Sequence, residues 1–115
     1  MTRVSLVVAL ALAGCGASLP PEAARAEARK IWDERCSNCH GERGHGDGPG
    51  AKLLPVRPRN LSDQHWQSDA TDERIAQVIL DGGASIGLDS NMAANPDLRT
   101  KPEVVDALVE LVRGL

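Results

Sequence analysis

The sequence predicts an all-α domain with about three main helices and long loops. Apolar residues recur at helical spacing in three segments, no segment alternates apolar and polar residues as a half-buried strand does, and glycine and proline gather between the helical segments. The chain has 115 residues, which is room for one domain. We expect this domain to occupy residues 22–115.

The N-terminal segment is similar to the signal of a bacterial lipoprotein. Residues 4–13 are almost all apolar and follow Arg3, and this run is too short to cross a bilayer, which takes about 20 residues. The run ends in Leu-Ala-Gly-Cys, which resembles the lipobox, where the cysteine is lipidated and the chain is cut before it. We therefore expect a signal peptide over residues 1–14, lipid on Cys15 and a lipidated tether over residues 15–21. An ordinary signal peptide with a chance cysteine, or a buried N-terminal helix, is the alternative.

Such an anchor predicts a place in the bacterial cell envelope, bound to a membrane through Cys15 and facing the periplasm. Gly16 follows the cysteine, whereas lipoproteins kept in the inner membrane of Gram-negative bacteria usually carry Asp there. The outer membrane is therefore slightly favoured over the inner membrane.

The first main helix is expected over residues 22–35, which lack Gly and Pro and are rich in the helix formers Ala, Glu, Arg and Lys. Ala24, Ala28, Ile31 and Trp32 fall on one face of this helix and predict its buried side. The helix leads directly into a cysteine pair.

Cys36, Cys39 and His40 form the C-x-x-C-H pattern of haem c attachment. Two thiols at this spacing, at the end of a helix, can reach both vinyl groups of one porphyrin as thioethers, and the next residue brings an imidazole to the iron. A thioredoxin-type pair would follow a strand, and a structural zinc site needs four ligands where only His45 and His65 remain. A disulfide between residues three apart would be strained. The motif therefore predicts one covalently bound haem c.

Loops and a short helix are expected after the motif. Residues 41–50 contain five Gly and one Pro and predict a loop, which lacks the preceding strand of a dinucleotide fingerprint and the Lys-Ser/Thr pair of a phosphate loop. Residues 51–68 predict irregular chain with a short helix near residues 62–66. Long loops become reasonable in a chain that wraps a large prosthetic group.

The second main helix is expected over residues 72–81, where Thr71 can cap its start and Gly82-Gly83 can end it. Its expected apolar stripe consists of Ile75, Val78 and Ile79. The last helix is expected to begin at a capping box over residues 100–103, with Pro in its first turn. Its expected apolar face consists of Val104, Val105, Leu108, Leu111, Val112 and Leu115.

A haem iron also needs a candidate for its sixth position. Met92 is the only methionine left once the signal peptide is removed, and it lies in a polar, non-periodic loop that does not suit a core gap-filler. His45 follows His40 by only five residues, and a lone histidine such as His65 is usually a surface residue. We predict ligation by His40 and Met92, with bis-His ligation through His65 or an open sixth site as alternatives.

Together these pieces resemble the class I c-type cytochromes over residues 22–115. The resemblance rests on C-S-N-C-H, on the following G-x-x-G-x-G-D-G-P, on P-R-N-L at residues 58–61 and on the terminal helix. It implies a cytochrome c-like fold around one haem, held by thioethers at Cys36 and Cys39. The other site residues that it implies are His40 as proximal ligand, Met92 as distal ligand, Pro49 with a carbonyl that accepts the imidazole N–H, and Arg59 and Trp66 as partners of the haem propionates.

Three positions depart from the family pattern. Ala28 replaces the usual Gly where the first and last helices cross, and Leu111 replaces the usual Tyr or Phe, which removes an aromatic pair worth about 0.5–1.5 kcal/mol. We expect contact between Trp32 and Leu111 there instead. Ala93 follows Met92 where the family has Pro, which leaves the ligand loop less fixed.

The resemblance implies an electron carrier, not an enzyme, that passes one electron between redox protein partners outside the cytoplasm, alone or within a larger oxidoreductase. A haem protein with an open or labile distal site, which binds a gas or a peroxide, is the second interpretation. A zinc-binding structural lipoprotein is the third.

Charge is distributed unevenly along the chain. The formal net charge of −3 carries no basic excess, so no binding to nucleic acid is predicted. Residues 15–59 hold 8 basic and 6 acidic residues, whereas residues 60–115 hold 4 basic and 10 acidic residues. We expect salt-sensitive association with a redox partner through the more basic half, which carries the cysteines.

Aromatic residues are scarce, since the chain has two Trp and neither Phe nor Tyr. Aromatic side chains normally supply much of the apolar area of a core. A covalently held porphyrin would supply a large flat apolar group in their place, so we expect the fold to depend on it.

Overall fold

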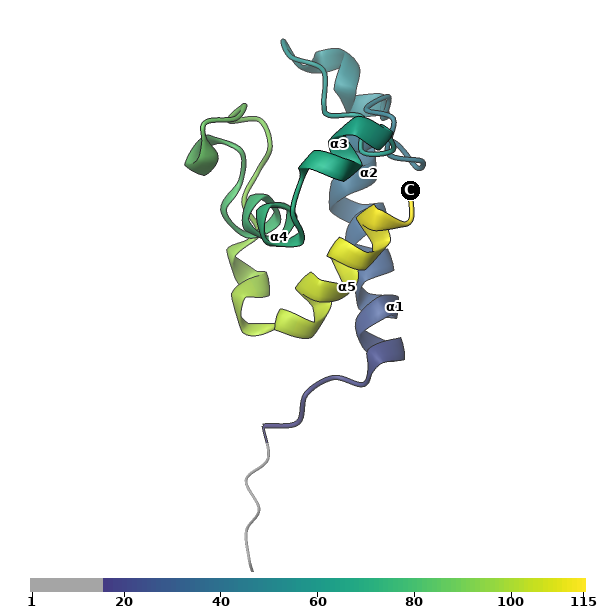
Figure 1. Ribbon diagram of the computed structural model, residues 1–115, viewed down its shortest axis with the longest axis vertical. Coiled ribbons are helices and arrows are strands. Elements are labelled where there is room, and N and C mark those ends of the chain that lie inside the picture. Colours follow the sequence, from purple (N-terminus) through teal and green to yellow (C-terminus); the bar gives the residue numbers. More distant parts are fainter. Residues whose placement is uncertain (1–15) are drawn as a thin grey trace, which may run out of the picture.

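The computed structural model describes residues 16–115, so the expected signal peptide and the lipid-bearing Cys15 lie outside the described part. Residues 16–115 form helices and loops and no strand (Figure 1), which confirms the predicted all-α class. The α-helices are α1 (Pro21–Ile31), α2 (Ser37–His40), α3 (Gln64–Asp69), α4 (Asp72–Asp81) and α5 (Pro102–Arg113). Shorter turns are the π turn η1 (Trp32–Cys36) and the 3₁₀ turns η2 (Pro49–Leu53), η3 (Ala84–Ile86) and η4 (Pro96–Thr100).

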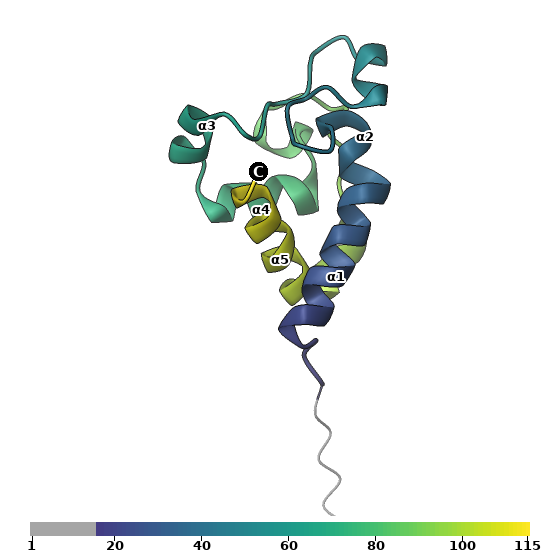
Figure 2. The same ribbon diagram turned by 90° about the vertical axis from the view of Figure 1, so that its right-hand side faces the viewer.

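A continuous helical rod runs from α1 through η1 to α2 (Figure 2). It begins at Pro21, one residue before the expected start, because proline suits the first helical position, where an N–H has no intrahelical partner. The predicted face is buried, with Ala24, Ala28 and Ile31 at most 5% exposed. Trp32 continues that face at the start of η1 and is 2% exposed.

The rod widens at η1, directly before the C-x-x-C-H motif. The N–H of Ser37 bonds to the carbonyl of Trp32, five residues earlier, and the Ser37 hydroxyl donates to the carbonyl of Asp33 at 3.1 Å. The extra residue in this turn rotates Cys36 and the residues after it relative to the buried face of α1. The expected regular helix over residues 22–35 did not include this turn.

Helix α4 lies where the sequence predicts it. The Thr71 side chain accepts a hydrogen bond from the N–H of Arg74 at 3.1 Å, and the helix ends at Gly82 with φ of 78°. A positive φ at this position favours glycine over every other residue. Ile75 and Ile79 of the predicted stripe are buried.

Helix α3 begins two residues later than expected. Asp63 caps it by accepting the N–H of Trp66 at 2.9 Å. One helical turn further on, the amide of Gln67 donates to the carbonyl of Val112 at 2.9 Å and so links α3 to α5.

The capping box expected for α5 does not form, and that prediction is wrong. The Thr100 hydroxyl donates to the carbonyl of Asp97 at 3.4 Å, and Lys101 separates it from the first helical residue, Pro102. Proline itself therefore starts the helix. The buried residues of α5 are Val104, Val105, Ala107, Leu108, Val109 and Val112.

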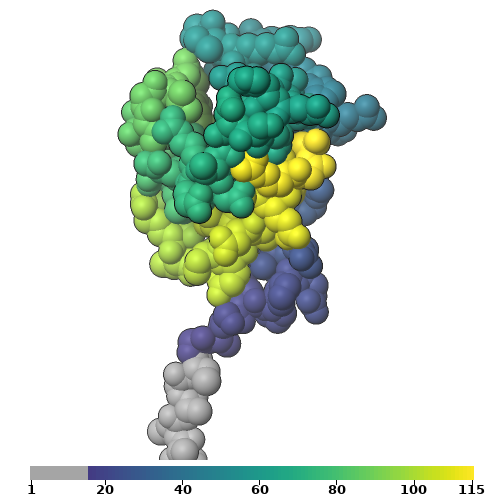
Figure 3. Space-filling view, in the orientation of Figure 1, coloured from purple at the N-terminus to yellow at the C-terminus, as the bar shows by residue number. Residues whose placement is uncertain are grey.

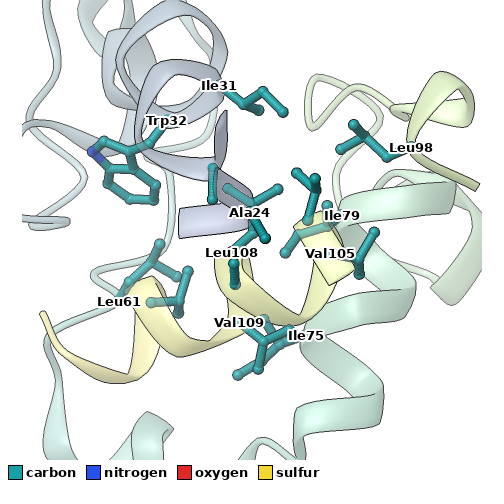
Figure 4. Close-up of a cluster of buried hydrophobic side chains, with 14 residues drawn as sticks. Ala24, Ile31, Trp32, Leu61, Ile75, Ile79, Leu98, Val105, Leu108 and Val109 are labelled. Atoms are coloured by element: carbon teal, nitrogen blue, oxygen red, sulfur yellow. The ribbon is translucent and has the colours of Figure 1, made fainter. Parts of the chain in front are cut away.

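The core lies where α5 crosses the rod (Figure 4). Ala24 and Ala28 are small enough to let the two helices approach closely, and Leu111 lies half-buried at the edge of this contact. Trp32 is the one aromatic residue among the fully buried side chains of the described chain. No helix within residues 16–115 has the length and apolar character that a bilayer crossing requires.

Candidate functional site

The three motif residues lie at the end of the rod. Cys36 closes η1, and Cys39 and His40 belong to α2. All three side chains are half-buried, and both thiols are free. Burial raises the pKa of Cys36 to about 11, which favours the protonated thiol at neutral pH.

The imidazole of His40 is held by the backbone of a distant segment. Its Nδ1–H donates to the carbonyl oxygen of Arg59 at 3.1 Å. This bond fixes the tautomer and leaves Nε2 with a free lone pair, as a metal-binding histidine requires. Burial lowers the pKa of His40, against the opposing effect of the Arg59 bond, and a low pKa keeps the ring neutral for coordination.

The structure corrects the acceptor expected for this imidazole. The resemblance implied the carbonyl of Pro49, whereas the acceptor in the structure is the carbonyl of Arg59. Pro49 is exposed at the start of η2, after the loop has passed the helix end. A backbone carbonyl leaves no side-chain signal in the sequence. Arg59 was therefore expected at the site only for its guanidinium, as a partner of the propionates.

The glycine-rich loop caps the last turn of α2. The N–H of Gly46 donates to the carbonyl of His40 at 2.7 Å, and the N–H of Gly48 donates to the carbonyl of Cys39 at 3.1 Å. Farther along, the N–H of Leu61 donates to the carbonyl of Gly44 at 2.6 Å, which brings the Arg59 segment to His40. The loop therefore orients the imidazole through its backbone contacts with α2 and with the segment that carries Arg59.

We expect Gly48→Ala to destabilise the domain and lower the yield of haem-loaded protein. A Cβ atom at Gly48 would lie 2.3 Å from the carbonyl oxygen of Asn38 and 2.4 Å from that of Ser37. Overpacking of this kind costs about 1–3 kcal/mol or more. Thermal unfolding measures the loss. Gly114→Ala is the matched control, because its Cβ would meet its nearest neighbour at an ordinary 3.5 Å; equal unfolding temperatures would contradict the close packing.

The loop that carries Met92 folds back on the end of α4. The N–H of Gly83 donates to the carbonyl of Met92 at 3.0 Å, and a Cβ atom at Gly82 would lie 2.8 Å from the same oxygen. Met92 is half-buried. The glycine pair that ends α4 therefore also permits the close approach of the Met92 backbone.

The other expected site residues lie in different surroundings. The side chain of His65 is 87% exposed on α3, with Nδ1 3.2 Å from the carboxylate of Asp69, and His45 is exposed in the glycine-rich loop. Trp66 is half-buried and packs against the core, and the Arg59 side chain is exposed. The histidine alternatives thus have exposed side chains, in contrast to the half-buried Met92.

The described residues fit a large apolar prosthetic group. Cys36, Trp66, Ala76 and Leu80 pack against the core but remain only half-buried, so part of their apolar surface is left for a further apolar group to cover. Two thiols and a neutral imidazole with a free Nε2 are the donor set that haem c requires. Nowhere in residues 16–115 do three His, Cys, Asp or Glu side chains gather to hold a metal ion, so the zinc alternative lacks a ligand set there.

Two further features lie around the motif. The rings of Trp32 and His40 are tilted by 30° with centroids 6.4 Å apart, and the indole nitrogen faces away from the labelled aliphatic side chains (Figure 4). Within the described chain this buried N–H has no acceptor.

An open groove of about 710 Å³ runs beside the glycine-rich loop. None of the three motif residues lines this groove, so it is distinct from the candidate haem site.

The segment around η2 lies at the end of the molecule opposite residues 16–20 (Figure 3), and it carries two exposed apolar residues. Leu53, at the end of η2, is 86% exposed, and Val56 is 56% exposed. Lys52 and Arg57 flank them in the sequence and are exposed as well.

The fold and the C-x-x-C-H helix define a c-type cytochrome. Residues 23–112 match the family model "Cytochrome C oxidase, cbb3-type, subunit III", and the chain belongs to this family. Membership implies haem c and electron transfer, as the sequence predicted.

Known proteins agree with this assignment. The chain is 33% identical over 95 residues to the cbb3-type cytochrome c oxidase subunit FixP of Azorhizobium caulinodans, in a match that covers 80% of this chain and 29% of that protein. The solved structure of the KustC0563 c-type cytochrome is similar with a TM-score of 0.56 and 32% identity, over 76% of this chain and 94% of that one. The structure of a tyrosine-to-phenylalanine mutant of that cytochrome matches with the same TM-score and identity, over 95% of the mutant chain.

Proposed function

We propose that the protein is a single-haem electron carrier, lipid-anchored at Cys15, that passes one electron between redox protein partners outside the cytoplasm. The observation that carries the proposal is the Nδ1–H bond from His40 to Arg59, which leaves Nε2 free at the end of a helix with two unpaired thiols. When bound, haem supplies an iron that alternates between the ferrous and ferric states.

The residues of the chain hold and tune that group. Cys36 and Cys39 would form the thioethers, His40 would serve as the proximal ligand and Met92 as the distal ligand. Two ligands in both oxidation states keep reorganisation small, and His/Met ligation with apolar burial raises the reduction potential. Arg59 and Trp66 are proposed partners of the propionates; of the two side chains, the exposed guanidinium is the more accessible.

The anchor is proposed from the N-terminal sequence. Cys15 lies outside the described residues, and residues 16–20 form an exposed, non-helical segment before α1. This segment is short, so a lipid at Cys15 would hold the domain close to an envelope membrane on its periplasmic side. The outer membrane remains the favoured location on the Gly16 argument.

The partner is proposed to be a redox protein that accepts or supplies electrons for an oxidase. The FixP relative is named as a subunit of a cytochrome c oxidase, and this chain covers only 29% of that protein, so the wider assembly is itself part of the proposal. Exposed Leu53 and Val56, between Lys52 and Arg57, offer an apolar contact with a basic rim. Such a rim favours a partner surface with acidic residues.

The visible spectrum of protein matured with a haem-attachment system tests the proposal. We expect one haem per chain that stays with the protein after denaturation, and a far-red sulfur-to-iron band in the oxidised state. The reduced protein should bind carbon monoxide slowly, because Met92 occupies the sixth position. Rapid uptake by the native protein would favour the gas- or peroxide-binding alternative, and a colourless protein that carries zinc would establish the structural one.

A further inference from the structure

Arg35 connects the helical rod to the segment that follows Met92. Its two terminal nitrogens donate to the two carboxylate oxygens of Asp97, each at 3.0 Å, and Nη1 also donates to the side-chain oxygen of Asn95 at 3.1 Å. Arg35 directly precedes Cys36, and its partners lie 60 and 62 residues farther along the chain. Planar two-point pairing between a guanidinium and a carboxylate fixes geometry as well as distance.

Asn95 also bonds to the end of α4, so it connects the Arg35 contacts to that helix. Its backbone N–H bonds to the carbonyls of Ile79 and Leu80, at 3.2 and 3.1 Å, and its side-chain amide donates to the carbonyl of Ile79 at 2.8 Å. One residue thus joins the exit of the Met92 loop to α4 and, through Arg35, to the turn that carries Cys36. Met92 itself is also joined to the end of α4, because the N–H of Gly83 donates to its carbonyl.

The residues directly after Met92 do not by themselves hold the loop in one conformation. Ala93 and Ala94 are exposed, and proline first restricts the backbone at Pro96, four residues after the methionine. Gly83 joins Met92 to α4, whereas the contacts of Asn95 and Asp97 with Arg35 join the loop to the turn that carries Cys36.

We propose that Arg35 is a positioning residue for the distal ligand, and that its contacts with Asn95 and Asp97 hold Met92 within reach of the haem iron. The inference rests on the proposed function, because it takes Met92 as the sixth ligand. We propose no contact of Arg35 with iron or haem, so its effect is exerted only through the loop. Loss of the Arg35 contacts should increase the population of loop conformations in which the Met92 sulfur no longer binds the haem iron.

An exposed ion pair contributes little to global stability, which makes the proposal testable in folded protein. The side chains of Arg35 and Asp97 are 41% and 54% exposed. Arg25 and Glu110 form a matched pair, also with two hydrogen bonds, at 3.0 and 3.1 Å, and with side chains 61% and 59% exposed. That pair joins α1 to α5 and does not involve the Met92 loop.

The experiment compares haem-loaded Arg35→Gln, Arg35→Lys and Arg25→Gln proteins with the native protein. We expect Arg35→Gln to raise the rate of carbon monoxide binding to the reduced protein by about fivefold, and to shift the alkaline loss of the far-red band to lower pH. Arg35→Lys should lie between Arg35→Gln and native protein, because an ammonium cannot form the planar two-point contact. Arg25→Gln should match the native protein in both measurements.

Two results would overturn the inference. In one, Arg35→Gln lowers the unfolding temperature but leaves the far-red band and the carbon monoxide rate unchanged, which would make Arg35 only structural. In the other, Arg25→Gln changes both measurements as much as Arg35→Gln does. Failure of the proposed function gives a different result, because the native protein itself would then lack the far-red band.

Discussion

Replacement of both Cys36 and Cys39 by alanine is expected to yield a chain that retains no haem after denaturation and does not fold cooperatively. Trp32 is the one aromatic residue in the fully buried core, and the half-buried residues around it leave apolar surface uncovered. A porphyrin covers at least the area of two aromatic side chains, so its loss costs on the order of 8 kcal/mol. Small domains have a total stability of about 5–15 kcal/mol.

Haem staining after denaturing electrophoresis and thermal unfolding followed by circular dichroism measure the two effects. The single variants Cys36→Ala and Cys39→Ala are the controls, because each keeps one thioether and the imidazole of His40. Both should retain haem after denaturation and unfold at temperatures between the native protein and the double variant. A double variant that unfolds cooperatively at the native temperature would contradict the dependence of the fold on haem.

The sequence predicted correctly those elements whose ends and buried faces are determined by residues close together in the chain. Helix α4 has the predicted ends because a threonine cap at Thr71 and a positive φ at Gly82 are determined by the residues next to them. The apolar face of the rod was predicted for the same reason, since burial of Ala24 and Ala28 follows from spacing alone. The C-x-x-C-H motif is local in the same sense.

Contacts between distant segments account for what the sequence did not predict. The capping box at Thr100 failed because its hydroxyl donates to Asp97 in a preceding 3₁₀ turn. The acceptor for His40 is a backbone carbonyl 19 residues away, which no side-chain pattern identifies. The contacts of Arg35 with Asp97 join residues 62 apart, and neither residue belongs to a motif.

The site therefore combines a local motif with supports that are not local. The orientation of the His40 imidazole depends on the glycine-rich loop and the Arg59 carbonyl. The position of Met92 depends on the glycine pair after α4 and on Asn95. The two predicted ligands are thus positioned by different parts of the chain.

Met92→Ala tests the distal side directly, and we expect it to open the sixth coordination position without loss of haem. The far-red sulfur-to-iron band should disappear, and the reduced protein should bind carbon monoxide rapidly. The reduction potential should fall by roughly 0.1 V or more, within the range of about 0.8 V that axial ligands span. Met92 is only half-buried in a loop, so its truncation should leave a folded domain.

Two control variants separate loss of the ligand from damage to the loop. Met92→His supplies a replacement ligand, so it should bind carbon monoxide slowly while its potential still falls, because the thioether that favours the ferrous state is absent. His65→Ala removes the competing candidate, whose side chain is 87% exposed, and should leave both spectrum and potential unchanged. A far-red band that survives in Met92→Ala would exclude Met92 as the sulfur ligand. Loss of six-coordination in His65→Ala would instead support the bis-His alternative, since no other change in that variant affects the iron.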